Sequence, residues 1–372
     1  MRIMNKIIAI CVALCFFVSC SDDDAILPEL KSSGLEENQN QLQLGKSLAL
    51  TPSLNTKDVD YQWKINNEVV SNEATLLFNP DKIGNYTIHF SATNSSGTAE
   101  CTYDIEVIKL RDKVENSSAY LTTLLEYKPA PGQYINEEIG LPENAEQIVG
   151  EPSSNLLTLG GFGGYVIAGF DHTIMNTEGK DFQVYANSFD GSSEAGIVMV
   201  MFDLNGNDKA DDEWYELKGS AHDDPQTIRN YTITYTNPKG TADVPWTDNQ
   251  GNSGVVKQNS YHVHNYYPEF IAEQDQITFT GTLLPNKKGT NDKGWIVIDE
   301  FDYGYVDNYS EEYPSNKANQ FDINWAIDKD GKSVTLPGID FVKIYTAVNI
   351  DAGILGEVST EIKGAADLSM LN

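Results

Sequence analysis

One stretch of the 372-residue chain repeats oxygen-bearing side chains at alternate positions around Gly206. Such a loop can wrap a hard cation, because Ca²⁺ takes about six to eight oxygen ligands and a glycine turn brings alternate residues inward. The expected ligands are Asp203, Asn205, Asn207, Asp211 and the carbonyl oxygen of Lys209. Trp214 stands where the usual loop ends in a bidentate Glu, so the alternative is a solvated acidic turn. We predict a structural calcium ion here.

A second cluster combines two histidines with aromatic side chains over residues 261–270. If residues 261–265 form a strand, His262 and His264 lie on one face. Two imidazoles are too few for a zinc site, and the sequence supplies no third ligand nearby. The same face can present rings to a planar or sugar-like ligand, and the alternative is a strand end with partly packed aromatics. The predicted ligand contacts are His262, His264, Tyr266, Tyr267 and Trp246.

No other segment has the spacing of a catalytic motif. The glycine run at residues 160–164 is followed neither by the Lys-Ser/Thr pair of a phosphate loop nor by a helical pattern. The chain contains no Gly-x-Ser-x-Gly elbow. Neighbouring acids such as Asp299 and Glu300 point to opposite faces of a strand and do not form a general acid/base pair. We therefore predict that the protein is not an enzyme.

Short strands must position these residues, because no long segment has a helical period. The expected strands of the C-terminal part are residues 165–170, 181–185, 196–202, 231–235, 276–280, 295–298, 321–326 and 341–346. The Asp-Lys-Asp-Gly sequence at residues 328–331 predicts a hairpin between the last two. This all-β pattern predicts a larger, jelly-roll-like β-sandwich domain over residues 119–372, after a polar linker at residues 109–118.

Residues 36–109 show a second, smaller β pattern. The sequences Tyr-Gln-Trp at residues 61–63 and Gly-Asn-Tyr-Thr-Ile at residues 84–88 resemble a PKD or immunoglobulin-like domain. The resemblance implies a sandwich with Trp63 in its core and a corner tyrosine at Tyr86. Cys101, on the last strand, is predicted to be a core residue. The domain is expected to act as a spacer, with adhesion as the alternative.

The C-terminal part also resembles a known group of proteins. The stretches at residues 160–164, 169–172, 203–215 and 340–346 are similar to a family of Bacteroidetes cell surface lipoproteins found near corrinoid uptake loci. The resemblance implies a corrinoid (vitamin B12) ligand and a TonB-dependent outer-membrane transporter as partner.

The N-terminus has the pattern of an exported lipoprotein. Arg2 and Lys6 precede an apolar run that ends in Ser19-Cys20, which resembles a bacterial lipobox and implies cleavage after residue 19 and a lipid on Cys20. Residues 20–35 are predicted to be an acidic, polar tether, and its Ser-Asp-Asp-Asp start resembles an export signal of Bacteroidetes surface lipoproteins. Cys101 is then the one thiol left, so no internal disulfide is expected.

The charge balance argues against one class of partner, nucleic acid. With 55 acidic and 25 basic residues the net charge is -30, which repels nucleic acid. The sequence therefore predicts a non-enzymatic lipoprotein, anchored to the outer membrane and facing the exterior, that captures a small ligand, first a corrinoid. The alternatives are a glycan-binding lipoprotein and an adhesion or scaffold protein.

Overall fold

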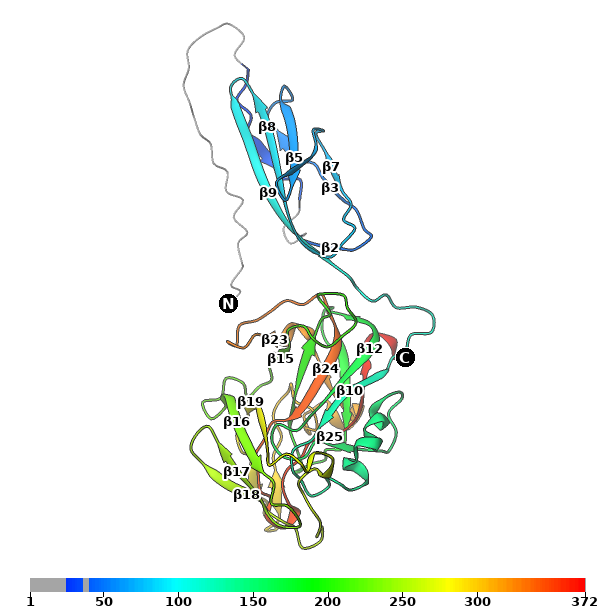
Figure 1. The fold of residues 1–372 in the computed structure, drawn as a ribbon, viewed down its shortest axis with the longest axis vertical. Coiled ribbons are helices and arrows are strands. Elements are labelled where there is room, and N and C mark those ends of the chain that lie inside the picture. Colours follow the sequence, from blue (N-terminus) through cyan, green and yellow to red (C-terminus); the bar gives the residue numbers. More distant parts are fainter. Residues whose placement is uncertain (1–24, 36–39, 372) are drawn as a thin grey trace. The chain divides into compact units, whose positions relative to one another are not determined.

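A computed structural model describes residues 25–35 and 40–371, and the chain divides into two compact units (Figure 1). The N-terminal unit extends to Leu110 and also takes in residues 204–208, and the C-terminal unit comprises residues 111–203 and 209–371. Strands dominate both units, so the predicted all-β fold is confirmed. The signal segment, Cys20 and the first part of the predicted tether lie outside the described residues. None of the helices in the described part of the chain has the length and apolar character of a membrane span.

The N-terminal unit is built on one five-stranded sheet. Its order is β2 (Gln41–Gln43), β9 (Gly97–Ile108), β8 (Gly84–Asn94), β5 (Asp60–Ile65) and β6 (Glu68–Ser71). Two strand pairs, β3 (Leu48–Leu50) with β7 (Leu76–Phe78) and β1 (Leu30–Ser32) with β4 (Ser53–Leu54), complete the unit. The predicted tether therefore ends before residue 30, because residues 30–32 pair with β4.

Alternation along β8 and β9 turns one face of this sheet into a core. Trp63 is fully buried and its ring lies 4.7 Å from that of Phe90, while Cys101 is buried on β9 as predicted. The Tyr86 hydroxyl donates to the carbonyl oxygen of Lys82, four residues upstream. Such a bond is typical of the tyrosine corner in immunoglobulin-like sandwiches.

The C-terminal unit contains a β-sandwich. One layer has the order β10 (Thr123–Lys128), β12 (Tyr165–Met175), β24 (Gly338–Thr346), β14 (Gly196–Met201), β15 (Tyr215–Leu217) and β23 (Ala326–Ile327). The other has the order β11 (Leu157–Thr158), β25 (Glu361–Asp367), β13 (Phe182–Ala186) and β22 (Ala318–Phe321). Buried Val166 and Val342 of the first layer share one core cluster with Val184 and Ile362 of the second.

A further four-stranded sheet belongs to the same unit and has a core of its own (Figure 1). Its order is β18 (Ser253–Val256), β17 (Val244–Asp248), β16 (Ile228–Thr236) and β19 (Gln276–Leu283). Six buried tyrosines and phenylalanines from it and from adjoining segments, among them Tyr231 and Tyr235, pack in this core. A short hairpin of β20 (Lys288–Thr290) and β21 (Ile296–Ile298) follows.

Helical segments are short. They are η1 (Glu138–Gly140), η2 (Pro142–Ile148), η3 (Glu269–Ile271), α1 (Tyr313–Asn316), η4 (Ile323–Trp325), η5 (Gly353–Leu355) and η6 (Leu368–Met370).

The strand expected over residues 321–326 is wrong. The carboxylate of Asp322 accepts the N–H of Asn324 and caps the turn η4, which separates β22 from β23. The turn at residues 328–331 forms, with Asp328 accepting from the N–H groups of Asp330 and Lys332. However, β23 pairs with β15 while β24 pairs with β12 and β14, so the expected hairpin between them does not exist.

Candidate functional site

Five loops of the C-terminal unit meet, and we call this region the loop end. It comprises residues 131–138, 187–194, 257–265, 285–299 and 351–357. Two amide side chains connect three of these loops. Gln133 donates from Nε2 to the carbonyl oxygen of Leu355 at 2.9 Å, and Asn259 donates from Nδ2 to Gln133 Oε1 at 3.2 Å and to the carbonyl oxygen of Ile354 at 3.0 Å.

The other two loops join through main-chain and lysine contacts. The N–H of Ile298 donates to the carbonyl oxygen of Gly191 at 2.9 Å, which ties residues 187–194 to residues 285–299. The ammonium of Lys288 donates to the carbonyl oxygen of Asp351 at 2.6 Å. All five loops therefore form one hydrogen-bonded assembly.

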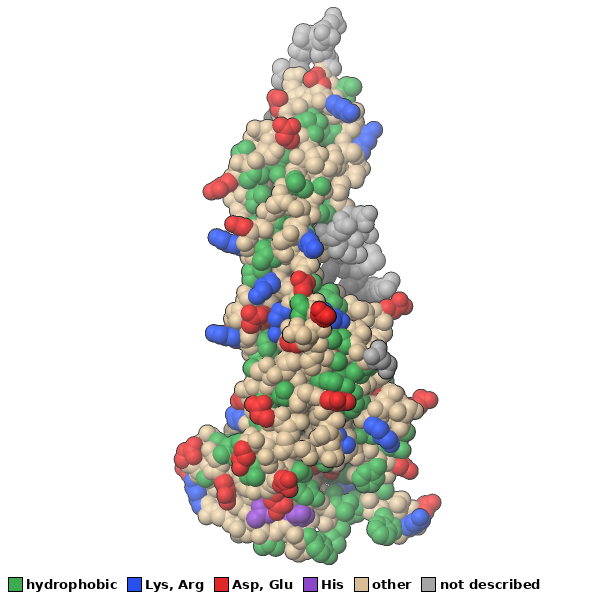
Figure 2. Space-filling model, turned by 90° about the vertical axis from the view of Figure 1, so that its right-hand side faces the viewer, with side chains coloured by type: hydrophobic (Ala, Val, Ile, Leu, Met, Phe, Trp, Pro, Cys, Tyr) green, Lys and Arg blue, Asp and Glu red, His purple; other side chains and the backbone are tan. Residues whose placement is uncertain are grey.

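This assembly exposes large apolar side chains. Tyr261, Trp295 and Phe189 are 75%, 70% and 63% exposed. Val263 and Ile354 are exposed to a similar extent. Figure 2 shows hydrophobic side chains together with histidine and acidic side chains at the lower end of the C-terminal unit. Single exposed apolar residues are ordinary, but several of them on interconnected loops indicate an interaction surface.

The predicted histidines lie in this region, but not on a strand. Residues 259–262 form a turn closed by the N–H of His262, which donates to the carbonyl oxygen of Asn259. The expectation of a strand is therefore wrong, because turn geometry replaces the period-two pattern. Glu137, which the sequence analysis did not include, meets both rings, with its oxygens 3.8 Å from Nδ1 of His262 and 3.2 Å from Nδ1 of His264.

Two of the other predicted ligand contacts, Tyr266 and Tyr267, are not at the surface. Tyr266 and Tyr267 are fully buried in the core beside the four-stranded sheet. The prediction that their side chains contact a ligand directly is therefore wrong. The Tyr266 hydroxyl instead accepts a hydrogen bond from the N–H of Asn259, and this bond connects the loop at residues 257–265 to the core. Trp246, on β17, is half-buried and packs over Gly254 of β18.

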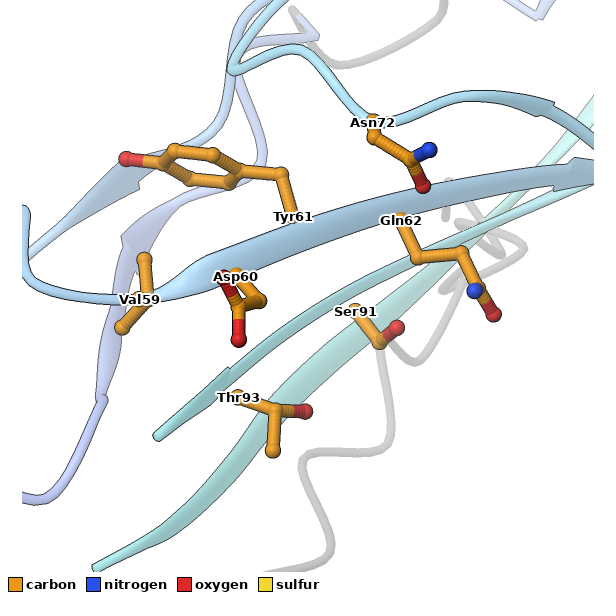
Figure 3. A pocket seen from close by; sticks show the side chains of 7 residues that line it. All are labelled: Val59, Asp60, Tyr61, Gln62, Asn72, Ser91 and Thr93. Atoms are coloured by element: carbon orange, nitrogen blue, oxygen red, sulfur yellow. The ribbon is translucent and has the colours of Figure 1, made fainter. Parts of the chain in front are cut away.

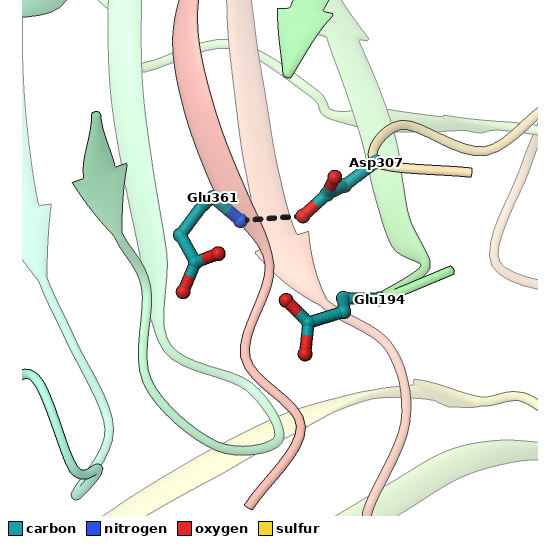
Figure 4. A group of neighbouring side chains, drawn as sticks. All are labelled: Glu194, Asp307 and Glu361. Carbon is teal, nitrogen blue, oxygen red and sulfur yellow. Dashed lines mark hydrogen bonds between the residues drawn. The ribbon is translucent and has the colours of Figure 1, made fainter. Parts of the chain in front are cut away.

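Three carboxylates of the C-terminal unit lie close together, and one of them, Glu194, belongs to the loop end (Figure 4). Glu194, Asp307 and Glu361 bring one oxygen each within 4.8 Å of one another. Asp307 is fully buried and accepts the N–H of Glu361 at 2.9 Å, and Glu361 is 6% exposed and accepts from Ser359 at 2.9 Å. We call these three residues the carboxylate trio. Sequence reasoning missed this trio, because its members come from three distant segments of the chain.

Burial raises the pKa of all three groups. Desolvation raises the pKa of Glu194 and of Asp307 well above the ordinary value, and the negative charge of Glu361 raises both further. Burial likewise raises the pKa of Glu361. Nearby Glu357, whose Oε1 accepts the N–H of Gln133, has a pKa raised to about 8, first by burial. Oxygen ligands of this type can hold a hard cation, or the trio can retain a proton at neutral pH.

The predicted calcium loop has turn geometry around Gly206. Asp203 is buried and its N–H donates to Asp340 Oδ2 at 2.8 Å. Asn205 Oδ1 accepts the N–H of Asn207, and Gly206 and Asp208 take positive φ angles of 64° and 60°. Such turns bring side chains inward, but calcium binding by Asp203, Asn205, Asn207, Lys209 and Asp211 stays a prediction.

A hollow of the N-terminal unit lies beside β5 and β8 (Figure 3). Asp60, Gln62, Ser91 and Thr93 line it with polar groups, and Tyr61 contributes one ring. Polar side chains are normal on the solvent face of a sandwich sheet.

One protein-family model matches part of the chain. A family described as PKD-like domain matches residues 31–94. The N-terminal unit resembles a PKD-like domain. The predicted resemblance is thus confirmed for this unit, with a match that begins five residues before the predicted boundary. No curated protein matches the chain.

Solved structures give only distant similarity. A SusE-like protein is 9% identical with a TM-score of 0.27, and the alignment covers 91% of this chain and 96% of that one. A carbohydrate-binding module of the β-sandwich superfamily is 8% identical with a TM-score of 0.23, covering 92% and 98%. A quinonprotein alcohol dehydrogenase-like protein of Bacteroides thetaiotaomicron is 10% identical with a TM-score of 0.20, covering 83% and 71%. At these values the similarity assigns neither ligand nor activity.

Proposed function

We propose that the protein is a non-enzymatic lipoprotein of the cell surface that captures carbohydrate at the loop end of its C-terminal unit. The observation that carries the proposal is the exposure of Tyr261 and Trp295 on loops that belong to one hydrogen-bonded assembly. A flat aromatic ring covers the C–H face of a sugar. Amides and main-chain groups around it can pair with hydroxyls.

The rest of the chain fits a capture role. The predicted lipid on Cys20 would hold the protein at the outer membrane, and the PKD-like unit would space the loop end from it. A TonB-dependent transporter is the partner proposed to receive the ligand. A corrinoid, implied by the family resemblance, is the competing ligand, and the same surface would have to bind it.

Affinity electrophoresis of the mature protein through a panel of neutral polysaccharides tests the proposal. We expect retardation by at least one polysaccharide, weakened about tenfold in Trp295→Ala or Tyr261→Ala, since one stacked ring contributes about 1 kcal/mol or more. Tyr303→Ala, which removes a 44% exposed ring outside the loop end, is the matched control.

Two results would overturn the proposal. One is free migration through every polysaccharide. The other is retardation that the two loop-end variants leave unchanged. A parallel titration with cyanocobalamin follows tryptophan emission, and saturable quenching that Trp295→Ala abolishes would replace carbohydrate by a corrinoid.

A further inference from the structure

Residues 111–118 form no strand or helix and belong to the C-terminal unit, and we call them the strap. At its start, Nη1 of Arg111 donates to the carbonyl oxygen of Phe170 at 2.8 Å. At its end, the N–H of Ser118 donates to Asp171 Oδ2 at 3.0 Å. Both partners belong to β12, so the strap is fastened to this strand at two points.

A fully buried histidine of β12 lies next to these contacts. Nδ1 of His172 lies 2.7 Å from Asp171 Oδ1, and Nε2 lies 2.9 Å from Asp367 Oδ2. An ionised carboxylate only accepts hydrogen bonds, so each ring nitrogen must carry a proton to bond its partner, and both do so only in the imidazolium ion. Burial by itself lowers the pKa of His172, but these hydrogen bonds raise it above the ordinary value of 6.5.

The same two carboxylates hold the strap. Asp367 Oδ2 also accepts from the ammonium of Lys113, in the middle of the strap, at 3.1 Å. Asp171 accepts from Ser118 through one oxygen and bonds the imidazole through the other. His172 therefore connects the two acids that bind the strap.

The charges around the buried ring balance when the ring is protonated. The imidazolium and Lys113 carry two positive charges, and Asp171 and Asp367 carry two negative ones. The neighbouring Arg111 and Asp340 pair with each other at 3.0 Å. A neutral ring would leave a net negative charge at this place and turn a lone pair toward a carboxylate oxygen, and both effects weaken the hold on the strap.

We propose that protonated His172 fastens the strap to the C-terminal unit and that loss of its proton, as the pH rises, releases the strap. A group whose folded pKa is raised stabilises the folded arrangement fully below its unfolded pKa, here 6.5, and this contribution is lost as the pH rises through the folded pKa. Because the strap directly follows the N-terminal unit in the chain, its release lengthens the free segment between the two units. The proposal does not depend on carbohydrate binding, because none of these residues belongs to the loop end.

Hydrogen–deuterium exchange of the mature protein between about pH 6 and about pH 9, read by mass spectrometry, tests the proposal. After correction for the intrinsic exchange rate, opening of residues 111–121 should increase by up to about tenfold per pH unit above about pH 6.5, because one proton is released on opening. His172→Gln cannot carry the charge and should open these residues at every pH. The matched control is His89→Gln, at a histidine of β8 bonded to Thr102, which should behave as the wild type.

Histidine-selective carbon-13 NMR measures the protonation of the ring directly. One histidine signal of the wild type should titrate with a midpoint above 6.5. In Lys113→Met the midpoint of that signal should rise further, because the ammonium no longer repels the imidazolium. The side chain of Lys113 is 39% exposed, so its replacement leaves the core intact.

The proposal is overturned if the corrected exchange of the strap does not vary with pH, or if His172→Gln retains the pH dependence. It is equally overturned if residues 338–346 of β24 open in parallel with the strap, since the whole unit then unfolds. If His172→Gln does not fold, the NMR titration decides, and the absence of a histidine midpoint that Lys113→Met raises refutes the role of the proton.

Discussion

Replacing Glu194 by Gln is expected to stabilise the C-terminal unit at neutral and alkaline pH. The carboxylate oxygens of Glu194, Asp307 and Glu361 lie within 4.8 Å of one another, and burial raises the pKa of each. Full ionisation would place three negative charges together. The amide of Gln removes one of these charges and offers an N–H donor to its neighbours at every pH.

The size of the effect follows from the separation. Two unit charges 4.8 Å apart repel by about 3.5 kcal/mol at an effective dielectric constant of about 20. Retention of a proton by the wild type relieves part of this repulsion. We therefore expect a gain of about 1–3 kcal/mol at about pH 8.

The pH dependence has a definite sign. A carboxyl whose folded pKa lies above its unfolded value holds its proton longer in the folded state. The resulting destabilisation begins as the pH rises above the ordinary value of 4.5 for Glu194 and grows toward the raised folded pKa. The wild type should thus lose stability as the pH rises above about 5, and the variant should lose less. Near pH 4 the two should coincide.

Thermal unfolding followed by near-ultraviolet circular dichroism, with a chelator present, measures this difference. Glu300→Gln, at an exposed carboxylate, is the matched control and should change little. A lower melting temperature for Glu194→Gln than for the wild type at about pH 8 would refute the reasoning. If calcium raises the melting temperature of the wild type but not of the variant, a bound cation rather than a retained proton relieves the repulsion among the three carboxylates.

Three further predictions concern other parts of the chain. Asp367→Asn should destabilise the C-terminal unit by about 3 kcal/mol at neutral pH, because buried Asp367 accepts from His172 at 2.9 Å and from Lys113 at 3.1 Å. Burial would raise the pKa of Asp367, but these hydrogen bonds hold it at about 2. In urea titrations the difference in unfolding free energy between wild type and variant should therefore shrink as the pH falls below 3.8 toward about 2. A difference that stays constant with pH would contradict the pairing. A chelator should lower the melting temperature of the wild type, calcium should restore it, and Asn207→Ala should remove the response if residues 203–211 hold the ion, whereas an unchanged response would exclude this loop. Cys20→Ser should shift the exported protein from the detergent phase to the aqueous phase in a detergent partition assay, and equal partition of both would argue against the lipid anchor.

The sequence alone determined the class of fold and much of its local structure. Period-two alternation placed the strands at residues 165–170, 231–235, 276–280 and 341–346, and each lies within a strand of the structure. It also identified Trp63 and Cys101 as core residues, because apolar side chains on alternate strand positions face a sheet's packed side. These are local properties, and the backbone geometry of a strand fixes them.

Tertiary structure decided which of the aromatic residues face the solvent. Tyr261 and Tyr266 lie five positions apart in one polar and aromatic segment, yet the first is 75% exposed and the second fully buried. A turn at residues 259–262 and the packing of the four-stranded sheet cause this difference, and neither has a periodic signal.

The charged sites depend on the fold even more strongly. Asp307 and Glu361 are 54 residues apart in the chain but joined by a hydrogen bond, and Glu137 meets His262 and His264 across two separate loops. Such contacts depend on how strands are ordered within the sandwich and where its loops converge. Chain spacing carries no record of that order, because strands adjacent in a sheet can come from any part of the sequence.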